Sequence, residues 1–199
     1  FSCRAFTEKP VSKELIEEIL DVAKQAPSGG NLQPWHIHVI SGKKLDQIVS
    51  DIESKITDMP MGEKTEYDVY PPNLWDPYRS RRFKCGEDLY KSINIPREDK
   101  GARLSQLAKN LRFFDAPVGL FVYIDRKMGP PQWSDVGMFL QTVMLIAREK
   151  GLHSCAQEAW AMWHSTVNKH LVVDNKFMLF CGMGIGYADE NHPINSWRT

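Results

Sequence analysis

The chain has 199 residues, 42% of them hydrophobic, and its 25 basic residues balance its 25 acidic ones. This is typical of one soluble globular domain with a substantial core. Zero net charge gives no general attraction to nucleic acid or to an anionic membrane, and no apolar run approaches the ~18 residues of a membrane span. No secretory signal is visible at Phe1, and the four scattered cysteines form no Cys-x-x-Cys pair, so we expect a cytoplasmic protein with reduced thiols.

The first expected elements are a helix and a strand joined by a short polar loop. Apolar residues recur at helical spacing over 15–23 after the candidate N-cap Ser12, and residues 36–40 alternate like a half-buried strand. The nonapeptide PSGGNLQPW at 27–35 joins them. Its paired glycines permit a flat or anionic ligand to approach the peptide N–H groups, and its polar side chains can add hydrogen bonds. We expect a ligand loop here, with an ordinary helix-ending turn as the alternative.

The composition changes over residues 57–100, which follow a helix expected over 45–56. Five prolines break regular structure there and aromatic residues crowd together, so we expect a lid or substrate-facing insertion. Tyr70 and Trp75 are candidates to stack on a planar substrate. Four basic residues lie within six positions, among them Arg79 and Arg82. They either recognise an anionic group or form a solvated basic stretch paired with nearby acids or a partner chain.

The later elements are a strand, a helix and a glycine-rich strand. Residues 118–124 predict a buried strand, and apolar residues circle the helix expected over 136–147, which should therefore be buried nearly all round. The run FCGMGIGY at 180–187 predicts a strand whose glycines admit close backbone or a ligand. It is not a dinucleotide-binding fingerprint, because it lacks the third glycine spacing, the following helix and the acidic partner. His36 and His38 lack a third ligand, so no metal site is predicted.

The run SCRAF at 2–6 contains Ser2 and Arg4, and with the loop at 27–35 it resembles the two N-terminal motifs of the FMN-dependent nitroreductase family. By this resemblance the first motif wraps the phosphate and ribityl chain of FMN, and the second reaches the flavin that is bound mainly by the other subunit. The match is specific over the first forty residues. The candidate contacts are Ser2 and Arg4 in the first motif, and Pro27, Ser28, Gly29, Asn31 and Gln33 in the second.

A third match, the decapeptide GLHSCAQEAW at 151–160, resembles the family segment along the reactive edge of the flavin. The resemblance places Ala156, Gln157 and Glu158 there, with a backbone N–H near Glu158 donating to flavin N5. No side chain is then catalytic, because N5 performs the chemistry. For Glu158, and for Asp135 further upstream, a helix N-terminal carboxylate is the alternative. The other flavin contacts implied by the resemblance are Asn110, Arg112, Asp135, Gly184 and Arg198.

The resemblance also implies a fold and an assembly. We expect an α+β nitroreductase fold over residues 1–199, with a central, mainly antiparallel sheet flanked by helices. The expected assembly is an intertwined homodimer that holds two FMN molecules at its interface. The helix over 136–147 would form the core of that interface and cover its own apolar surface with a partner chain.

The implied activity is an NAD(P)H oxidoreductase that reduces nitroaromatic compounds in two half-reactions at one FMN, with NADPH or NADH as the donor. Segment 57–100 is most similar to the branch that reduces nitroaromatic acids such as 4-nitrobenzoate, so Tyr70, Trp75, Arg79 and Arg82 become substrate contacts. The basic residues would then meet a substrate carboxylate or the 2′-phosphate of NADPH. The alternatives are reductive dehalogenation of a halotyrosine, enone or quinone reduction, and an FMN sensor or carrier without turnover. We expect no nucleic-acid or membrane partner.

Overall fold

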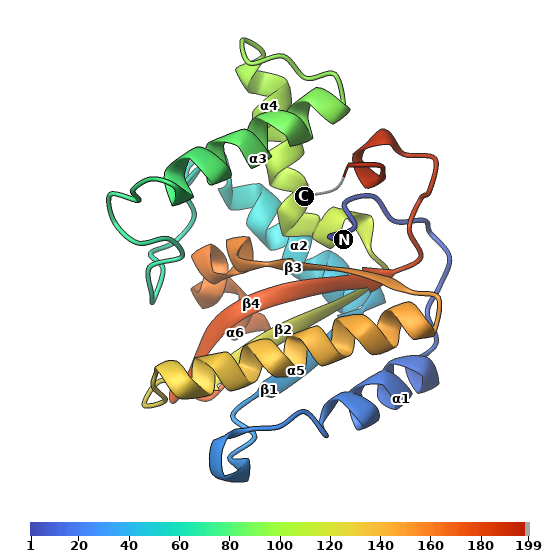
Figure 1. Cartoon of the computed structure of the whole chain (residues 1–199), viewed down its shortest axis with the longest axis vertical. Coiled ribbons are helices and arrows are strands. Elements are labelled where there is room, and N and C mark those ends of the chain that lie inside the picture. The colour runs from blue at the N-terminus through green and yellow to red at the C-terminus, as the bar shows by residue number, and fades with distance from the viewer. Residues whose placement is uncertain (198–199) are drawn as a thin grey trace.

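The computed structural model describes residues 1–197 and is an α+β fold built on one antiparallel sheet (Figure 1). The strands lie in the order β1-β2-β4-β3, and every neighbouring pair is antiparallel. The expected central antiparallel sheet is therefore confirmed. The strands are β1 (His36–Ser41), β2 (Val118–Asp125), β3 (His153–Gln157) and β4 (Phe177–Gly186).

Helices cover both faces of this sheet. One face carries α1 and α5, and the other carries α2 and α6 with two 3-10 segments, at 109–115 and 158–163. Two further helices, α3 and α4, lie together at one end of the molecule, at the top of the view in Figure 1. The helices are α1 (Lys13–Ala23), α2 (Gly42–Lys55), α3 (Tyr78–Ser92), α4 (Lys100–Ala108), α5 (Pro130–Glu149) and α6 (His164–Leu171). None of the helices in residues 1–197 is long and apolar enough to cross a membrane.

Residues 118–124 of strand β2 carry no charged side chain because both faces of the strand are buried there. Its even-numbered residues, such as Leu120 and Val122, join the core beneath α1 and α5. Phe121 and Tyr123 point to the opposite core, beneath α2 and α6. Successive side chains of a strand alternate between faces, so a central strand needs apolar residues at every position.

The glycines of β4 make room for aromatic rings. A Cβ atom at Gly182 would lie 2.3 Å from Trp160 Cδ1 and 2.8 Å from Phe113 Cε1, and one at Gly184 would lie 3.0 Å from the Phe113 carbonyl oxygen. These glycines are buried in the sheet, paired with β2 and β3. The close neighbours anticipated for this strand are thus the chain's own side chains and backbone.

Helix α5 is buried on one face only. Phe139, Val143 and Ala147 are buried against the sheet, whereas the side chains of Met138 and Leu145 are 38% and 61% exposed. The prediction of a helix buried nearly all round is wrong for the single chain, because nothing in residues 1–197 covers the outer face. An exposed apolar stripe on a long helix is typical of an interface.

Segment 57–100 contains more regular structure than its prolines suggested. Residues 57–77 are irregular, but α3 occupies 78–92, where no proline interrupts the chain, and the basic run forms its first two turns. Arg103 on α4 donates two hydrogen bonds to Glu87 on α3, at 2.6 and 3.0 Å, and so joins the two helices.

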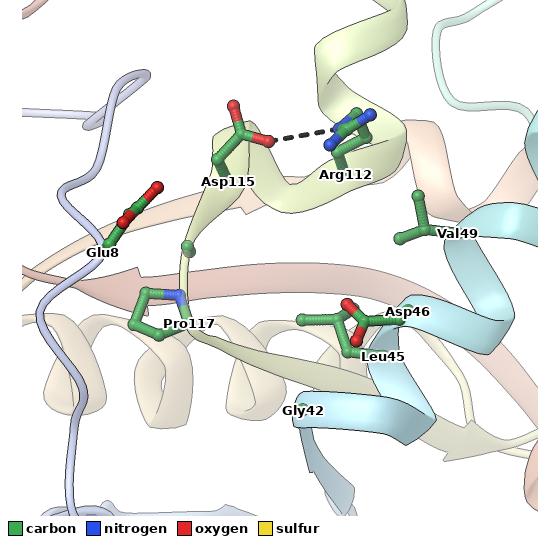
Figure 2. Close-up of a pocket in the computed structure, with 9 residues that line it drawn as sticks. Glu8, Gly42, Leu45, Asp46, Val49, Arg112, Asp115 and Pro117 are labelled. Atoms are coloured by element: carbon green, nitrogen blue, oxygen red, sulfur yellow. Dashed lines mark hydrogen bonds and ion pairs between the residues drawn. The ribbon is translucent and has the colours of Figure 1, made fainter.

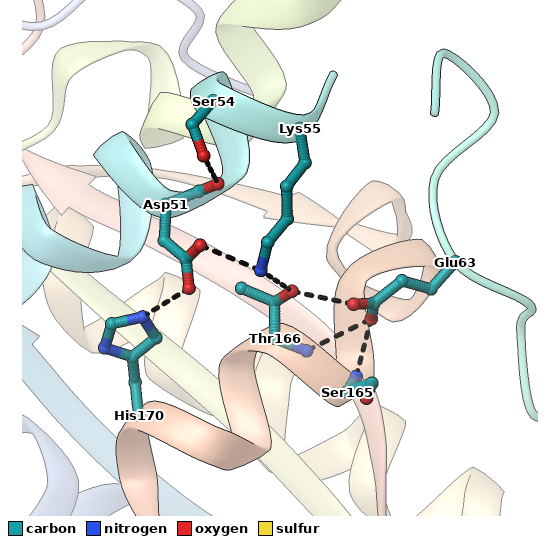
Figure 3. Close-up of polar contacts among 7 residues, drawn as sticks. All are labelled: Asp51, Ser54, Lys55, Glu63, Ser165, Thr166 and His170. Atoms are coloured by element: carbon teal, nitrogen blue, oxygen red, sulfur yellow. Dashed lines mark hydrogen bonds and ion pairs between the residues drawn. The ribbon is translucent and has the colours of Figure 1, made fainter. Parts of the chain in front are cut away.

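The start of this segment is fastened to the N-terminus of α6 (Figure 3). Glu63 accepts hydrogen bonds from the backbone N–H groups of Ser165 and Thr166, at 2.7 and 3.1 Å, and from the Thr166 hydroxyl at 2.7 Å. The Glu63 N–H donates to the Met162 carbonyl at 2.6 Å. Gly62 precedes it with a φ of +72°, and a Cβ there would lie 2.7 Å from the same oxygen, so this approach requires glycine.

Charged side chains of α2 also bind α6, close to the contact that Glu63 makes. Lys55 lies 2.8 Å from an Asp51 oxygen and donates to the Thr166 hydroxyl at 3.0 Å, and His170 lies 2.8 Å from the other Asp51 oxygen (Figure 3). The hydrogen bonds from Lys55 and His170 hold the pKa of Asp51 below its usual range. The carboxylate is therefore ionised at neutral pH, and these contacts link α2, α6 and Glu63.

We predict that Glu63→Ala lowers the free energy of unfolding by about 2 kcal/mol, because it leaves the buried N–H and hydroxyl of Thr166 without their acceptor. Urea unfolding measures the change, and limited proteolysis reports whether residues 57–77 loosen. Lys64→Ala is the matched control, since Lys64 is the exposed next residue. Equal stability of the two variants would contradict the role given to Glu63.

Candidate active site

A cavity of about 1000 Å³ lies between the end of β3, the N-terminal segment and helix α3. Its volume is at the upper end of the ~300–1,000 Å³ usual for small-molecule sites. The N-terminal segment contributes Arg4, and Tyr70, Arg79 and Arg82 come from segment 57–100. Asn110 and the run Cys155–Ala159 complete the part of the wall that is nearest the sheet. Parts of the chain that are far apart in sequence therefore meet here, and several are those singled out from the sequence.

Gln157 is the most constrained polar side chain of this wall. It is 2% exposed, and its Nε2 donates to the Asn110 carbonyl at 2.7 Å and lies 3.3 Å from Asn110 Oδ1. Its Oε1 is buried and has no hydrogen-bond partner within the described chain. A buried amide oxygen left unpaired costs about 1–3 kcal/mol. The cavity wall thus holds an acceptor whose partner would be an N–H or O–H group of a ligand.

Arg4 supplies a positive charge where the two ends of the chain meet. Its backbone N–H donates to Asn195 Oδ1 at 2.9 Å, and its guanidinium donates to the Ser2 carbonyl and lies 5.2 Å from the centre of the Trp197 ring. Asn195 is 4% exposed and donates to the Ala5 carbonyl at 2.7 Å. Asn195 does not line the cavity but holds the backbone of Arg4 there, and the sequence analysis did not single it out.

Segment 57–100 supplied four candidate substrate contacts, and three of them line the cavity: Tyr70, Arg79 and Arg82. The Arg82 guanidinium carbon lies 4.1 Å above the centre of the Tyr70 ring, and Arg79 pairs with Asp76 at 3.1 Å. Trp75 does not line the cavity. It is 56% exposed, and its ring packs edge-on against Tyr78 with 5.5 Å between ring centres.

The loop of residues 27–33 lies far from this cavity. It borders a separate polar hollow of about 350 Å³, at the end of the molecule opposite α3 and α4 (Figure 1). Inside the loop, Ser28 Oγ accepts from the Gln33 N–H at 2.9 Å, and Gln33 Nε2 donates to Asn31 Oδ1 at 2.9 Å. Asp135 is 6% exposed on α5 and accepts from the Gly29 N–H at 3.1 Å. The loop is therefore shaped by its own side chains and held by α5.

Three further candidates, Ser2, Arg112 and Gly184, are not among the residues that line the cavity. Arg112 pairs with Glu53 at 2.9 Å and Asp115 at 3.1 Å, and it borders a different hollow of about 350 Å³ (Figure 2). Gly184 is buried in β4. Arg198 lies outside the described residues. Asn110 and Arg112 are two positions apart, yet only Asn110 reaches Gln157.

The thiol of Cys155, which lies beside Gln157 in the wall, is not a reactive one. Burial raises the pKa of the Cys155 thiol to about 12, so it stays protonated at neutral pH. Within residues 1–197, no group of three His, Cys, Asp or Glu side chains is arranged to hold a metal ion. What the wall does provide is one unpaired acceptor, fixed cations and an aromatic face, which suits a flat ligand with a polar edge and an anionic end.

Comparison with known proteins agrees with this reading. The sequence model of the Nitroreductase family matches residues 1–187. The 4-nitrobenzoate reductase of Pseudomonas putida is 40% identical over 98% of this chain and 85% of its own length. The nitrobenzene nitroreductase of Ectopseudomonas oleovorans is 36% identical over 96% of this chain and 85% of its own length.

Solved structures agree with the sequence relatives. The FMN- and NADPH-dependent nitroreductase NfnB from Sphigopyxis sp. strain HMH has a TM-score of 0.96 at 47% identity, covering 100% of this chain and 89% of that one. NfnB from Mycobacterium smegmatis, solved in complex with NADPH, has a TM-score of 0.93 at 26% identity, covering 100% and 88%. The expected family and fold are thereby confirmed, and the chain belongs to the nitroreductase family.

Proposed function

We propose that this protein is an FMN-dependent NAD(P)H oxidoreductase that reduces nitroaromatic compounds, with nitrobenzoate-like acids as acceptors. The observation that carries the proposal is the unpaired, buried Oε1 of Gln157 in the wall of a cavity large enough for a flat cofactor. Two relatives that align with nearly the whole chain are named as reductases of 4-nitrobenzoate and nitrobenzene.

The residues around the cavity fit FMN. Gln157 and Asn110 offer amide groups to the polar edge of a heterocycle, and Arg4 offers a cation to an anionic end. Ala156 and Glu158 flank Gln157 in the same wall. When bound, FMN supplies the transfer of a hydride equivalent from NAD(P)H to the nitro group.

The protein's own part in this reaction is to position and to shield. The buried Gln157 amide is fixed by Asn110, so it can orient a heterocycle without first reorganising. The protonated Cys155 thiol beside it adds no competing nucleophile. Tyr70 offers an aromatic face on the side of segment 57–100, where a planar acceptor can stack. Because donor and acceptor would use one cavity in turn, a two-step ping-pong order follows.

A homodimer is part of the proposal. The loop residues Pro27, Ser28, Gly29, Asn31 and Gln33 cannot reach this cavity in their own chain, and the outer face of α5 exposes Met138 and Leu145. Both features are explained if a second copy packs on α5 and presents its loop to this cavity. Asp135 then acts by holding the loop through Gly29, rather than by touching FMN. We place the enzyme in the cytoplasm, because its four cysteines are unpaired.

The proposal is tested on protein purified without added flavin. Its visible spectrum and the released cofactor identify FMN, and NADPH is then added without oxygen, followed by 4-nitrobenzoate. We expect the flavin absorbance to bleach and then to recover, with two NADPH oxidised for each nitro group reduced through the nitroso compound to the hydroxylamine. Bleaching without recovery would reject the nitroaromatic acceptor, and protein that neither contains nor takes up FMN would reject the enzyme altogether.

A further inference from the structure

Two of the four basic residues at the start of α3 are neutralised by neighbouring acids, and of the other two, Arg81 and Arg82, only Arg82 lines the cavity. Arg79 pairs with Asp76, and Lys84 pairs with Asp88 one turn further along. Arg82 has no carboxylate partner within residues 1–197. The helical spacing explains this, because the positions three and four residues away are Arg79, Tyr78, Cys85 and Gly86, none of which is acidic.

Arg82 is nevertheless held in place. Its guanidinium lies 4.1 Å above the centre of the Tyr70 ring, and both residues line the cavity. A guanidinium that lies over an aromatic ring is attracted by the ring through its charge and still has N–H groups that can donate to an anion. Those groups match the two oxygens of a carboxylate or a phosphate. Because the ring already limits the motion of the side chain, less conformational entropy is lost when an anion binds.

The surroundings of Arg82 leave both room and charge for such an anion. Gly86, one turn along the same face, also lines the cavity, and a Cβ there would meet nothing within 4 Å. Glu87 is in the same wall, but both of its oxygens are bound by Arg103, so its charge is compensated. The carboxylate closest in sequence therefore does not compete for Arg82.

We propose that Arg82, held over the Tyr70 ring, binds the anionic group of the substrate or the electron donor. The bound molecule then lies against the wall that segment 57–100 contributes to the cavity. The inference rests on the proposed function and names the substrate class of that site. The anion is either the carboxylate of an aromatic acid acceptor or the 2′-phosphate of NADPH, which present the same chemistry to the guanidinium.

The test compares Arg82→Gln with wild type in four assays, which pair 4-nitrobenzoate or its methyl ester with NADPH or NADH. Losing a charge-assisted, two-pronged contact is expected to lower kcat/KM about 10- to 100-fold through a higher KM. If the carboxylate is the ligand, the loss falls on 4-nitrobenzoate and far less on its neutral ester. If the 2′-phosphate is the ligand, the loss falls on NADPH and far less on NADH. Either pattern supports the proposal.

A binding measurement and two further variants complete the design. Calorimetric titration with benzoate and with NADP⁺ measures the same two contacts without turnover. Arg81→Gln is the matched control, because Arg81 lies on the same turn, is exposed and does not line the cavity. Arg82→Lys keeps the charge but loses the planar fork, so we expect an intermediate loss.

Equal effects of Arg82→Gln on charged and neutral partners, or no effect on any of them, would overturn the role of Arg82. That outcome is distinct from a failure of the proposed function, in which the wild-type protein itself reduces neither nitroarene.

Discussion

Leu145→Asp is expected to yield a folded monomer that no longer retains FMN. Leu145 is 61% exposed and lies two helical turns from Met138 on the outer face of α5, so a charge there leaves the chain's own core intact. Within the proposed dimer the same position is enclosed, where an unpaired carboxylate costs several kcal/mol. The partner's loop is then lost as well. We expect dimerisation to weaken at least about 100-fold.

Light scattering coupled to size-exclusion chromatography measures the mass, and the absorbance ratio of flavin to protein measures the loading. Val172→Asp is the matched control, because Val172 is 89% exposed at the end of α6, a helix that belongs to the opposite core. A Leu145→Asp protein that stays dimeric would disprove the interface. A monomer that keeps a full complement of FMN would disprove the shared site.

Gly182→Ala is expected to destabilise the fold by about 3 kcal/mol, a large effect for one methyl group. The new Cβ would lie 2.3 Å from Trp160 Cδ1, and the Trp160 ring is stacked on Phe113 with 4.3 Å between ring centres. Phe121 packs edge-on against Trp160, with 4.9 Å between ring centres. All three rings are fully buried, so none can move aside without displacing another.

Urea unfolding measures this loss, and a flavin titration measures its effect on the site. Gly182 is the direct partner of Gln157 in the β3–β4 register, so a shift at this point also displaces the Gln157 amide. Gly101→Ala is the control, since a Cβ there meets only Asp99 Oδ1, at 3.7 Å. We expect it to be close to wild type. A Gly182→Ala protein as stable as this control would show that the rings yield more easily than their packing implies.

Local sequence was informative wherever local contacts decide the structure. Ser12 does cap α1, accepting from the Leu15 N–H at 3.2 Å, and the apolar run at 118–124 is the buried strand β2. Helix α3 was missed because prolines on either side of it dominate the composition of segment 57–100, although none lies within 78–92. The outer face of α5 could not be predicted in the same way. Its hydrophobic residues indicate that the surface must be covered, but they do not tell whether the same chain or a second copy covers it.

The sequence motifs predicted which segments form the candidate site, but not every residue that lines it. Gln157, Asn110 and Arg4 were named from the sequence and do meet at one cavity. Arg112 could not be separated from Asn110 by spacing, because the 3-10 segment at 109–115 leaves helical φ and ψ angles from Arg112 onward, with Phe113 and Phe114 at positive φ. Which unpaired arginine of α3 faces the cavity depends on the phase of the helix, and that phase is known only once the helix is placed.

The hydrogen bond between Asp135 and Gly29 has a consequence for how the enzyme is assembled. Helix α5 carries both this carboxylate, which fixes the loop, and the exposed apolar face that a second copy would cover. In the proposed dimer, anything that shifts α5 therefore acts on the contact between subunits and on the cofactor together. By thermodynamic linkage the two equilibria are reciprocal, so FMN strengthens subunit association by the same factor by which association strengthens FMN binding. Dilution and loss of flavin then become two routes to the same inactive species.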